Sequence, residues 1–283
     1  MDAFALRLAE EYYPMVDRPF IWSEYNSGTD NDLGEPMINI PTVTPRGGQG
    51  IPAHHTSFDT PAQFDPKSFR DLSVMNAAYA YFIASAGPDQ MLWMAELALA
   101  RGYDQIDAAA RSSLDQVAAA QDADGLGRLL YWETARVDDN LMRETRAVKQ
   151  AADLQQELAQ LASFAGIEKA RIESAIQQRA TDLHLGTIQP LLPKVNPEAE
   201  SIIVLRKAMG TLNMDDLPSA QHEGYPVSAF WGPTTSALYW CDGKRNLAEV
   251  IKYTELEMGH DNFDWVGYFK FLQRHGYVDF VHW

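Results

Sequence analysis

The residues of this chain best suited to metal chemistry stand in one short polar stretch near the amino end. His54 and His55 are followed by Asp59 and Thr60, and Asp65-Pro66 then begins an amphipathic helix. Imidazole is a common zinc ligand, and a neighbouring carboxylate or hydroxyl can fix its tautomer. The spacing suits a metal ligand on a loop, although a histidine in such a loop is also commonly a hydrogen-bonding residue and nothing more.

A wider pattern around this stretch resembles the end of the di-zinc aminopeptidase family, which includes bacterial leucyl aminopeptidase, glutamate carboxypeptidase and glutaminyl cyclase. The matching segments are the run 55–60, the helix start at 65–66, the upstream loop 27–31 (SGTDN) and the strand-like piece 40–43 (IPTV). The resemblance covers about residues 1–87. It implies an α/β metallopeptidase domain whose central part precedes these residues.

The resemblance implies that His55 is the last zinc ligand of the site and that Asp59 and Thr60 support it. A register shift of one residue would give the ligand role to His54. In the upstream loop, Asp30-Asn31 aligns with an aspartate that does not bind metal and with a position that is usually histidine. The asparagine is a departure from the family, so the role of this possible site loop stays open.

One ligand is too few for the chemistry that the family performs. Its members hold two zincs through a His, a bridging Asp, a Glu-Glu pair, an Asp and the final His, and one Glu of the pair is the general base. All but the final His come before the part that matches this chain. Glu10-Glu11 is a pair on the wrong element, the helix before the loop. We therefore expect no catalytic residue here, and zinc only if upstream sequence or a partner chain supplies the other ligands.

Hydrophobic patterning predicts a mixed α/β, mostly helical chain with four segments. Residues 1–87 are the end of the peptidase-like domain, 88–185 a helical bundle, 186–232 a linker that wraps over a neighbour, and 233–283 a winged-helix-like domain. One helix is predicted over residues 2–13 and another begins at residue 66. Further helices are predicted over 89–101, 104–121, 126–165 and 168–185, with Gly166 as a cap between the last two.

The winged-helix interpretation depends on element order near the carboxyl end. Asn246 and Glu249 form a capping-box pattern at the start of one helix, a second helix is expected over about 263–275, and residues 277–283 read as a strand. Ile202 to Leu205 is a further strand-like piece. Helix, helix and strand at this spacing outline a small winged helix.

Composition limits the partners. The formal net charge is -16, and acidic residues outnumber basic ones even in the winged-helix-like segment, so nucleic acid and anionic membranes are poor partners. Cys241 is the single cysteine, which excludes an intrachain disulfide and a cysteine-based zinc site. No membrane span and no signal peptide are evident, which favours a cytoplasmic protein unless the true start lies upstream.

These observations favour the C-terminal portion of a zinc aminopeptidase-like enzyme that hydrolyses peptide bonds only as part of a longer or assembled protein. The alternative is a non-catalytic interaction or scaffold protein derived from that family. An acidic transcription factor ranks last. Because residues 1–87 would lack their central strands, we expect the chain to hide apolar surface by self-association or against a partner.

Overall fold

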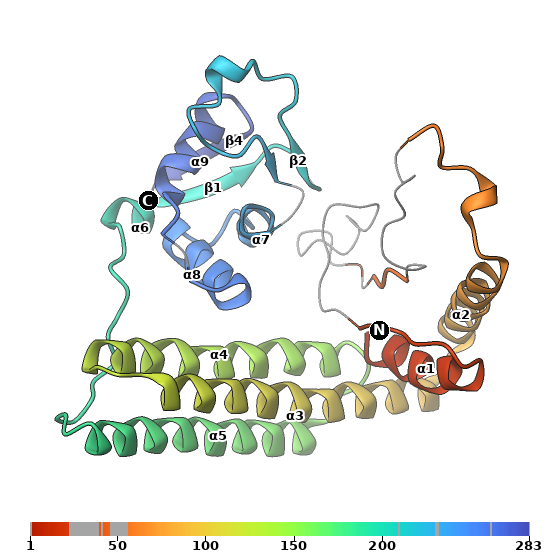
Figure 1. The fold of residues 1–283 in the computed structure, drawn as a ribbon, viewed down its shortest axis with the longest axis horizontal. Coiled ribbons are helices and arrows are strands. Elements are labelled where there is room, and N and C mark those ends of the chain that lie inside the picture. The colour runs from red at the N-terminus through yellow and green to blue at the C-terminus, as the bar shows by residue number, and fades with distance from the viewer. Residues whose placement is uncertain are drawn as a thin grey trace.

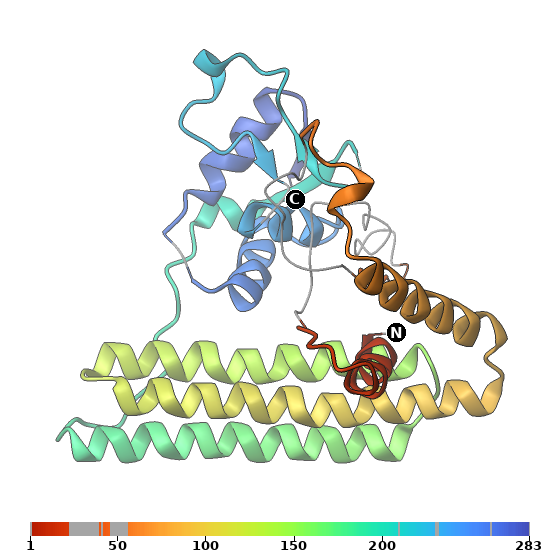
Figure 2. The same ribbon diagram turned by 45° about the vertical axis from the view of Figure 1, so that its right-hand side comes forward.

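The computed structural model of the chain describes residues 2–22, 40, 42–45, 56–208, 210–229, 232–260 and 262–282. Helices dominate this part of the chain, and its strands form two small antiparallel pairs. Along the sequence come an amino-terminal helix pair, a bundle of three long helices and a carboxy-terminal unit placed beside the bundle (Figure 1, Figure 2). The expected mixed, mostly helical class is therefore confirmed.

The amino-terminal pair consists of α1 (Asp2–Met15) and α2 (Pro66–Ser85). Phe4 of α1 joins them, because its ring stacks on Phe82 with centroids 4.2 Å apart and is only 5% exposed. The sequence predicts that Pro14 stops α1, but the helix includes this proline near its end. So close to the carboxyl end, the proline disturbs only the last turn of the helix.

The bundle is built from α3 (Pro88–Ala119), α4 (Ala123–Lys149) and α5 (Gln155–Asp182), which run antiparallel to their neighbours in sequence (Figure 1). One apolar stripe of each helix faces the other two. Their common core contains Ile106, Leu126, Val137, Leu161 and Ile172, all of them inaccessible to solvent. This burial is what holds three separate amphipathic helices in one body.

The first predicted helix break in the bundle is wrong. The sequence suggests two helices, 89–101 and 104–121, whereas α3 is continuous across Gly102. A Cβ at this position would lie 3.1 Å from Glu144 Cβ and 3.3 Å from Leu161 Cδ2. The glycine is thus required by the close approach of α4 and α5, and it does not end the helix.

The second predicted break is also displaced. The expected helices 126–165 and 168–185 are in fact α4 and α5, and the chain turns at residues 150–154. Gly166 lies inside α5, where a Cβ would meet only open space, so this glycine caps nothing. The turn contains neither glycine nor proline and has no strong local pattern. It forms where it lets Val148 and Leu158 enter the same core.

The carboxy-terminal unit, residues 197–282, contains helices and two small two-stranded sheets. Its helices are α6 (Pro197–Ser201), α7 (Pro233–Trp240), α8 (Leu247–Met258) and α9 (Trp265–Arg274). Strands β1 (Ile202–Arg206) and β4 (Val278–His282) pair antiparallel, with Val204 opposite Phe280, and β2 (Leu212–Asn213) pairs with β3 (Ser228–Ala229). The predicted strand near 202–205 is therefore confirmed, and the one predicted over 277–283 is confirmed for residues 278–282.

Local signals in this unit are accurate. The capping box at the start of α8 is present, since Asn246 accepts from the Glu249 backbone N–H at 2.9 Å and Glu249 accepts from the Asn246 N–H at 3.1 Å. The unit has its own core, in which Tyr268, Phe269 and Phe271 of α9 are fully buried. The aromatics of α9 thus serve packing.

The segment between α5 and α6 follows the bundle surface. Leu191 donates its N–H to the Gly127 carbonyl at 2.9 Å, and a Cβ on Gly127 would lie 2.9 Å from the Gln189 carbonyl oxygen. Gln177 exchanges two hydrogen bonds with the backbone of Ile188. The first part of the predicted wrapping segment is therefore attached to α4 and α5, while residues from 197 onward contribute to the carboxy-terminal core.

Candidate functional site

The polar loop that the sequence pattern singles out leads directly into α2. His54, His55, Asp30 and Asn31 lie outside the described residues. The predicted supporting residues, Asp59 and Thr60, are both exposed. Thr60 precedes a 3₁₀ turn at Pro61–Gln63. The described end of the loop is ordered by local hydrogen bonds, including one of 3.1 Å from the Asp59 N–H to the Thr56 carbonyl.

Asp65 fixes the point at which the loop becomes helix. Its carboxylate accepts from the backbone N–H groups of Lys67 and Ser68, as the predicted cap requires, and from the Ser68 hydroxyl at 2.7 Å. Arg18, just beyond α1, adds a 2.9 Å contact. The Ser68 hydroxyl, the Arg18 guanidinium and the backbone donors hold the pKa of Asp65 well below its usual range. The downstream end of the loop is thus anchored to both helices.

A buried carboxylate that no sequence motif indicated lies one turn further on. Asp71 is 2% exposed, accepts from Tyr12 Oη at 3.2 Å and from Arg70 Nε at 2.7 Å, and has Arg18 Nε 3.5 Å away. Two arginine cations and a tyrosine hydroxyl therefore surround one acid between α1 and α2. Such an arrangement orients the helices, and losing both arginines would leave a buried charge uncompensated.

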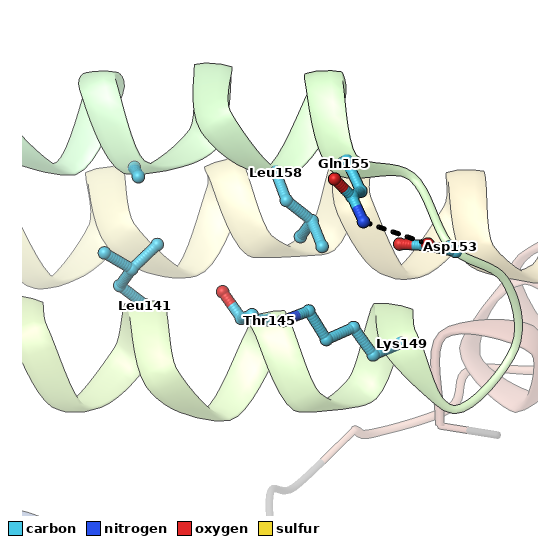
Figure 3. A pocket seen from close by; sticks show the side chains of 7 residues that line it. Leu141, Thr145, Lys149, Asp153, Gln155 and Leu158 are labelled. Carbon is cyan, nitrogen blue, oxygen red and sulfur yellow. Dashed lines mark hydrogen bonds between the residues drawn. The ribbon is translucent and has the colours of Figure 1, made fainter.

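A groove opens along the seam of α4 and α5, with a volume of about 690 Å³ (Figure 3). Its apolar part is lined by Leu141, Leu158 and Ala162. The polar part is lined by Thr145, Lys149, Asp153 and Gln155. Gln155 Nε2 donates to Asp153 Oδ2 at 3.2 Å, so part of the polar lining is already paired. The lining contains no histidine, cysteine or paired carboxylates.

A second polar cluster occupies the contact between α4 and the carboxy-terminal unit. Asp139 of α4 is 6% exposed, and its Oδ1 has no hydrogen-bond partner among the described residues. Burial raises the pKa of Asp139, and the Glu257 carboxylate of α8 raises it further. The rise in this pKa is opposed by the positive charges of Arg143 and Arg146 on α4 and of Lys252 on α8. The cluster brings together acids and bases more than 100 positions apart, which no local pattern in the sequence reveals.

Aromatic contacts surround the same junction. The Trp132 ring on α4 has its centroid 6.1 Å from the His260 ring, and Lys252 Nζ lies 5.9 Å from the Tyr131 ring centroid. His260 Nδ1 also lies 3.0 Å from Glu255 Oε1. The first two pairs connect α4 with the carboxy-terminal unit through rings and a cation.

Catalytic chemistry at this junction has one formal candidate, the hydroxyl of Ser236. It donates to Glu257 Oε2 at 2.5 Å, and Trp240 Nε1 donates to the same oxygen at 3.1 Å. Ser236 is 2% exposed, and it bonds the carboxylate directly, without an imidazole between them. Because Ser236 is shielded from solvent, a substrate could not reach its hydroxyl, and the pair is a structural contact between α7 and α8.

The described residues form neither a metal cluster nor a membrane span. No group of three or more His, Cys, Asp or Glu side chains in them is placed to hold a metal ion. Within the same ranges, no helix has the length and apolar character needed to cross a membrane. His55 itself lies outside these ranges.

No family model matches the chain, and neither a curated protein nor a solved structure matches it.

Proposed function

We propose that the chain is the C-terminal portion of a zinc aminopeptidase-like metallopeptidase, which contributes His55 and a supporting scaffold to peptide-bond hydrolysis. The order of the motifs, from the loop at 27–31 to the helix start at 65–66, supports this assignment. The observation that carries it is the anchored junction of loop and helix. Asp65 fixes the first turn of α2, and Arg18 ties that turn to α1, as a loop that presents a metal ligand requires.

The described residues do not by themselves fit a catalytic zinc. A catalytic zinc takes about three protein ligands and a water, whereas Asp59 and Thr60 offer oxygen atoms only. Glu10 and Glu11, the one adjacent pair of glutamates near the loop in sequence, both form ion pairs with Arg7 on an exposed part of α1. We therefore assign neither glutamate as a base and derive no catalytic step.

In this proposal the carboxy-terminal unit is a winged-helix-like accessory domain. The succession α8, α9 and β4, with β1 as the partner strand, agrees with the helix, helix and strand order of such a domain. Its contact with α4 supports a role as a module that contacts protein. Peptide substrates would be processed by the assembled domain, not by this unit.

A non-catalytic scaffold protein of the same ancestry is the second candidate, and one feature favours it. Helix α2 leaves a large apolar face uncovered, with Phe69 63% and Tyr81 76% exposed. That surface suits a chain whose task is to assemble with another. Both candidates share the same framework and differ in whether His55 binds metal.

A zinc titration of histidine ring resonances separates the two. We expect zinc to shift the His55 signals of the purified chain, and His55→Ala to remove that response. His222→Ala is the matched control, since its ring bonds the Leu217 carbonyl in the carboxy-terminal unit. Loss of the response in His54→Ala alone would move the ligand by one residue. An unchanged zinc response in His55→Ala would refute the metal-ligand assignment and favour the scaffold.

Hydrolysis of an aminoacyl-nitroanilide tests the other half of the proposal. The isolated chain should show no turnover with added zinc, because it lacks a general base and most ligands. Zinc-dependent turnover that disappears in His55→Ala would show that the chain carries a complete site.

A further inference from the structure

The outward face of α2 is unusual for a surface helix. From Leu72 to Gly87 the chain has no charged residue, and within α2 only Asp71 and Met75 are buried. Phe69, Val74 and Tyr81 are 63%, 42% and 76% exposed. A helix that is apolar around most of its circumference is normally covered on more than one side. In this structure α1 covers one side, and the opposite side carries these three exposed side chains.

Small residues form a regular line along the centre of that face. They are Ser73, Ala77, Ala80 and Ala84, spaced four, three and four residues apart. This is the spacing of the residues that meet along the seam of two packed helices. Small side chains at such positions allow two helix backbones to come close together. The shape of the face therefore suits another helix.

We propose that this helix is α2 of a second copy of the chain, packed antiparallel about a twofold axis at Ala77. A twofold contact must be complementary to itself. In this register, residues equally far before and after Ala77 face one another. Tyr81 then lies opposite Ser73 of the other copy, and Val74 lies opposite Ala80. Each large side chain meets a small one, whereas a parallel pair would set tyrosine against tyrosine.

Charge also selects the antiparallel second copy. Lys67 and Arg70 are in the first turns of α2, and the helix has no charge in its second half. Antiparallel packing brings these cations toward the carbonyl end of the partner helix, which is also near Asp89. Parallel packing would place the Lys67 side chains of the two copies side by side, where like charges repel, whereas Arg70 already pairs with Asp71 of its own helix.

The available surface is sufficient for a specific contact. Aromatic side chains have roughly 150–250 Å² each, so the exposed parts of Phe64, Phe69 and Tyr81, with Val74, amount to on the order of 1,000 Å² over two copies. Phe64 belongs to the face because its ring contacts that of Phe69, with centroids 6.3 Å apart. About 1,000 Å² is the lower range for a specific protein interface. We therefore expect a weak dimer and not an obligate assembly.

Disulfide trapping tests the register. Ala77→Cys places a thiol on the proposed axis, where it faces its own copy, and should give a disulfide-linked dimer under mild oxidation. Ala78→Cys is the matched control, since Ala78 is the exposed neighbour about 100° around the helix. The native Cys241 is buried and does not compete. Equal crosslinking of the two variants would overturn the proposed register.

Light scattering tests the association itself. The unmodified chain should be a dimer at about 100 µM. Ala77→Glu should make it a monomer with unchanged helical circular dichroism, because two carboxylates would meet on the axis, whereas Ala78→Glu should stay dimeric. A monomeric unmodified chain, or a dimeric Ala77→Glu variant, would overturn the proposal. Neither result depends on zinc or on His55, so the assignment of His55 as a metal ligand is tested separately.

Discussion

Ser236 on α7 donates a 2.5 Å hydrogen bond to Glu257 Oε2 on α8, although the two residues are 21 positions apart. Trp240 Nε1 donates to the same oxygen at 3.1 Å. Ser236 is buried, whereas Glu257 keeps part of its surface in solvent. One carboxylate oxygen therefore joins two helices beside the bundle, and it does so through two donors from α7.

Removal of the serine hydroxyl should weaken the carboxy-terminal unit. Ser236→Ala deletes a hydrogen bond to a charged group, which contributes about 1.5–3 kcal/mol when buried and less here because Glu257 is partly solvated. We expect a loss of about 1–2 kcal/mol in the free energy of unfolding, measured by urea denaturation. Ser163→Ala, at an exposed position of α5, is the control and should change stability by less than about 0.5 kcal/mol. Equal effects of both changes would argue against the contact.

Asp139 should make the stability of the α4–α8 junction depend on pH. Burial and the Glu257 carboxylate raise the pKa of Asp139, so the native state binds this proton more tightly than the unfolded state. The contribution of this bound proton to the free energy of unfolding is complete below the pKa of an ordinary aspartate. It is lost as pH rises through the raised pKa of the native state. The junction should therefore be weaker at neutral pH than in mild acid.

The variant Asp139→Asn isolates this effect. It keeps the shape and removes the charge, so we expect it to be more stable than the unmodified chain at pH 7 by about 1 kcal/mol, on the scale of one unsatisfied buried group. The gain should shrink as pH falls. Asp138→Asn, on the exposed neighbour that pairs with Lys169, is the control. A gain of the same size at pH 4.5 and pH 7 would contradict the assignment.

What could be predicted from the sequence was local. The caps at Asp65 and Asn246 are confirmed, because a cap needs only residues within one helical turn. The turn at 150–154 and the role of Gly102 were not predicted, since both depend on how three helices pack. The buried acids Asp71 and Asp139 were missed for the same reason. Part of the surroundings of each acid comes from a distant segment, α1 for Asp71 and α8 for Asp139, and each acid lies in a helix pattern that also suits a surface acid.

Two glycines of the bundle should respond in opposite directions to a larger side chain. Gly102→Val would push a branched side chain against Glu144 and Leu161, which already lie within 3.3 Å of the place a Cβ would take, and should cost about 1–3 kcal/mol. Gly166→Ala should raise stability by about 0.5–1 kcal/mol, since the position is helical, exposed and open. Thermal denaturation measures both. Destabilisation by Gly166→Ala would support the cap that the sequence suggested.

Three cations of the carboxy-terminal unit are engaged with acids of the same unit. Lys270 of α9 lies 2.7 Å from Glu198, Arg274 pairs with Glu223, and Arg245 lies 2.6 Å from Asp242. A surface that follows phosphates needs clustered positive charge and gains affinity by releasing counterions. Here each of three cations would have to leave a carboxylate before it could meet a phosphate.

Duplex DNA should therefore bind the chain very weakly. In a fluorescence-anisotropy titration of the full chain at about 150 mM salt, we expect a dissociation constant above about 100 µM, the weak end of non-specific binding. The double variant Glu198→Gln, Glu223→Gln releases two of the cations on α9 and should bind more tightly, with a steeper dependence on salt. That comparison shows whether the acids are what prevents binding. Micromolar binding by the unmodified chain, falling steeply with salt, would instead favour the transcription-factor alternative over a module that contacts protein.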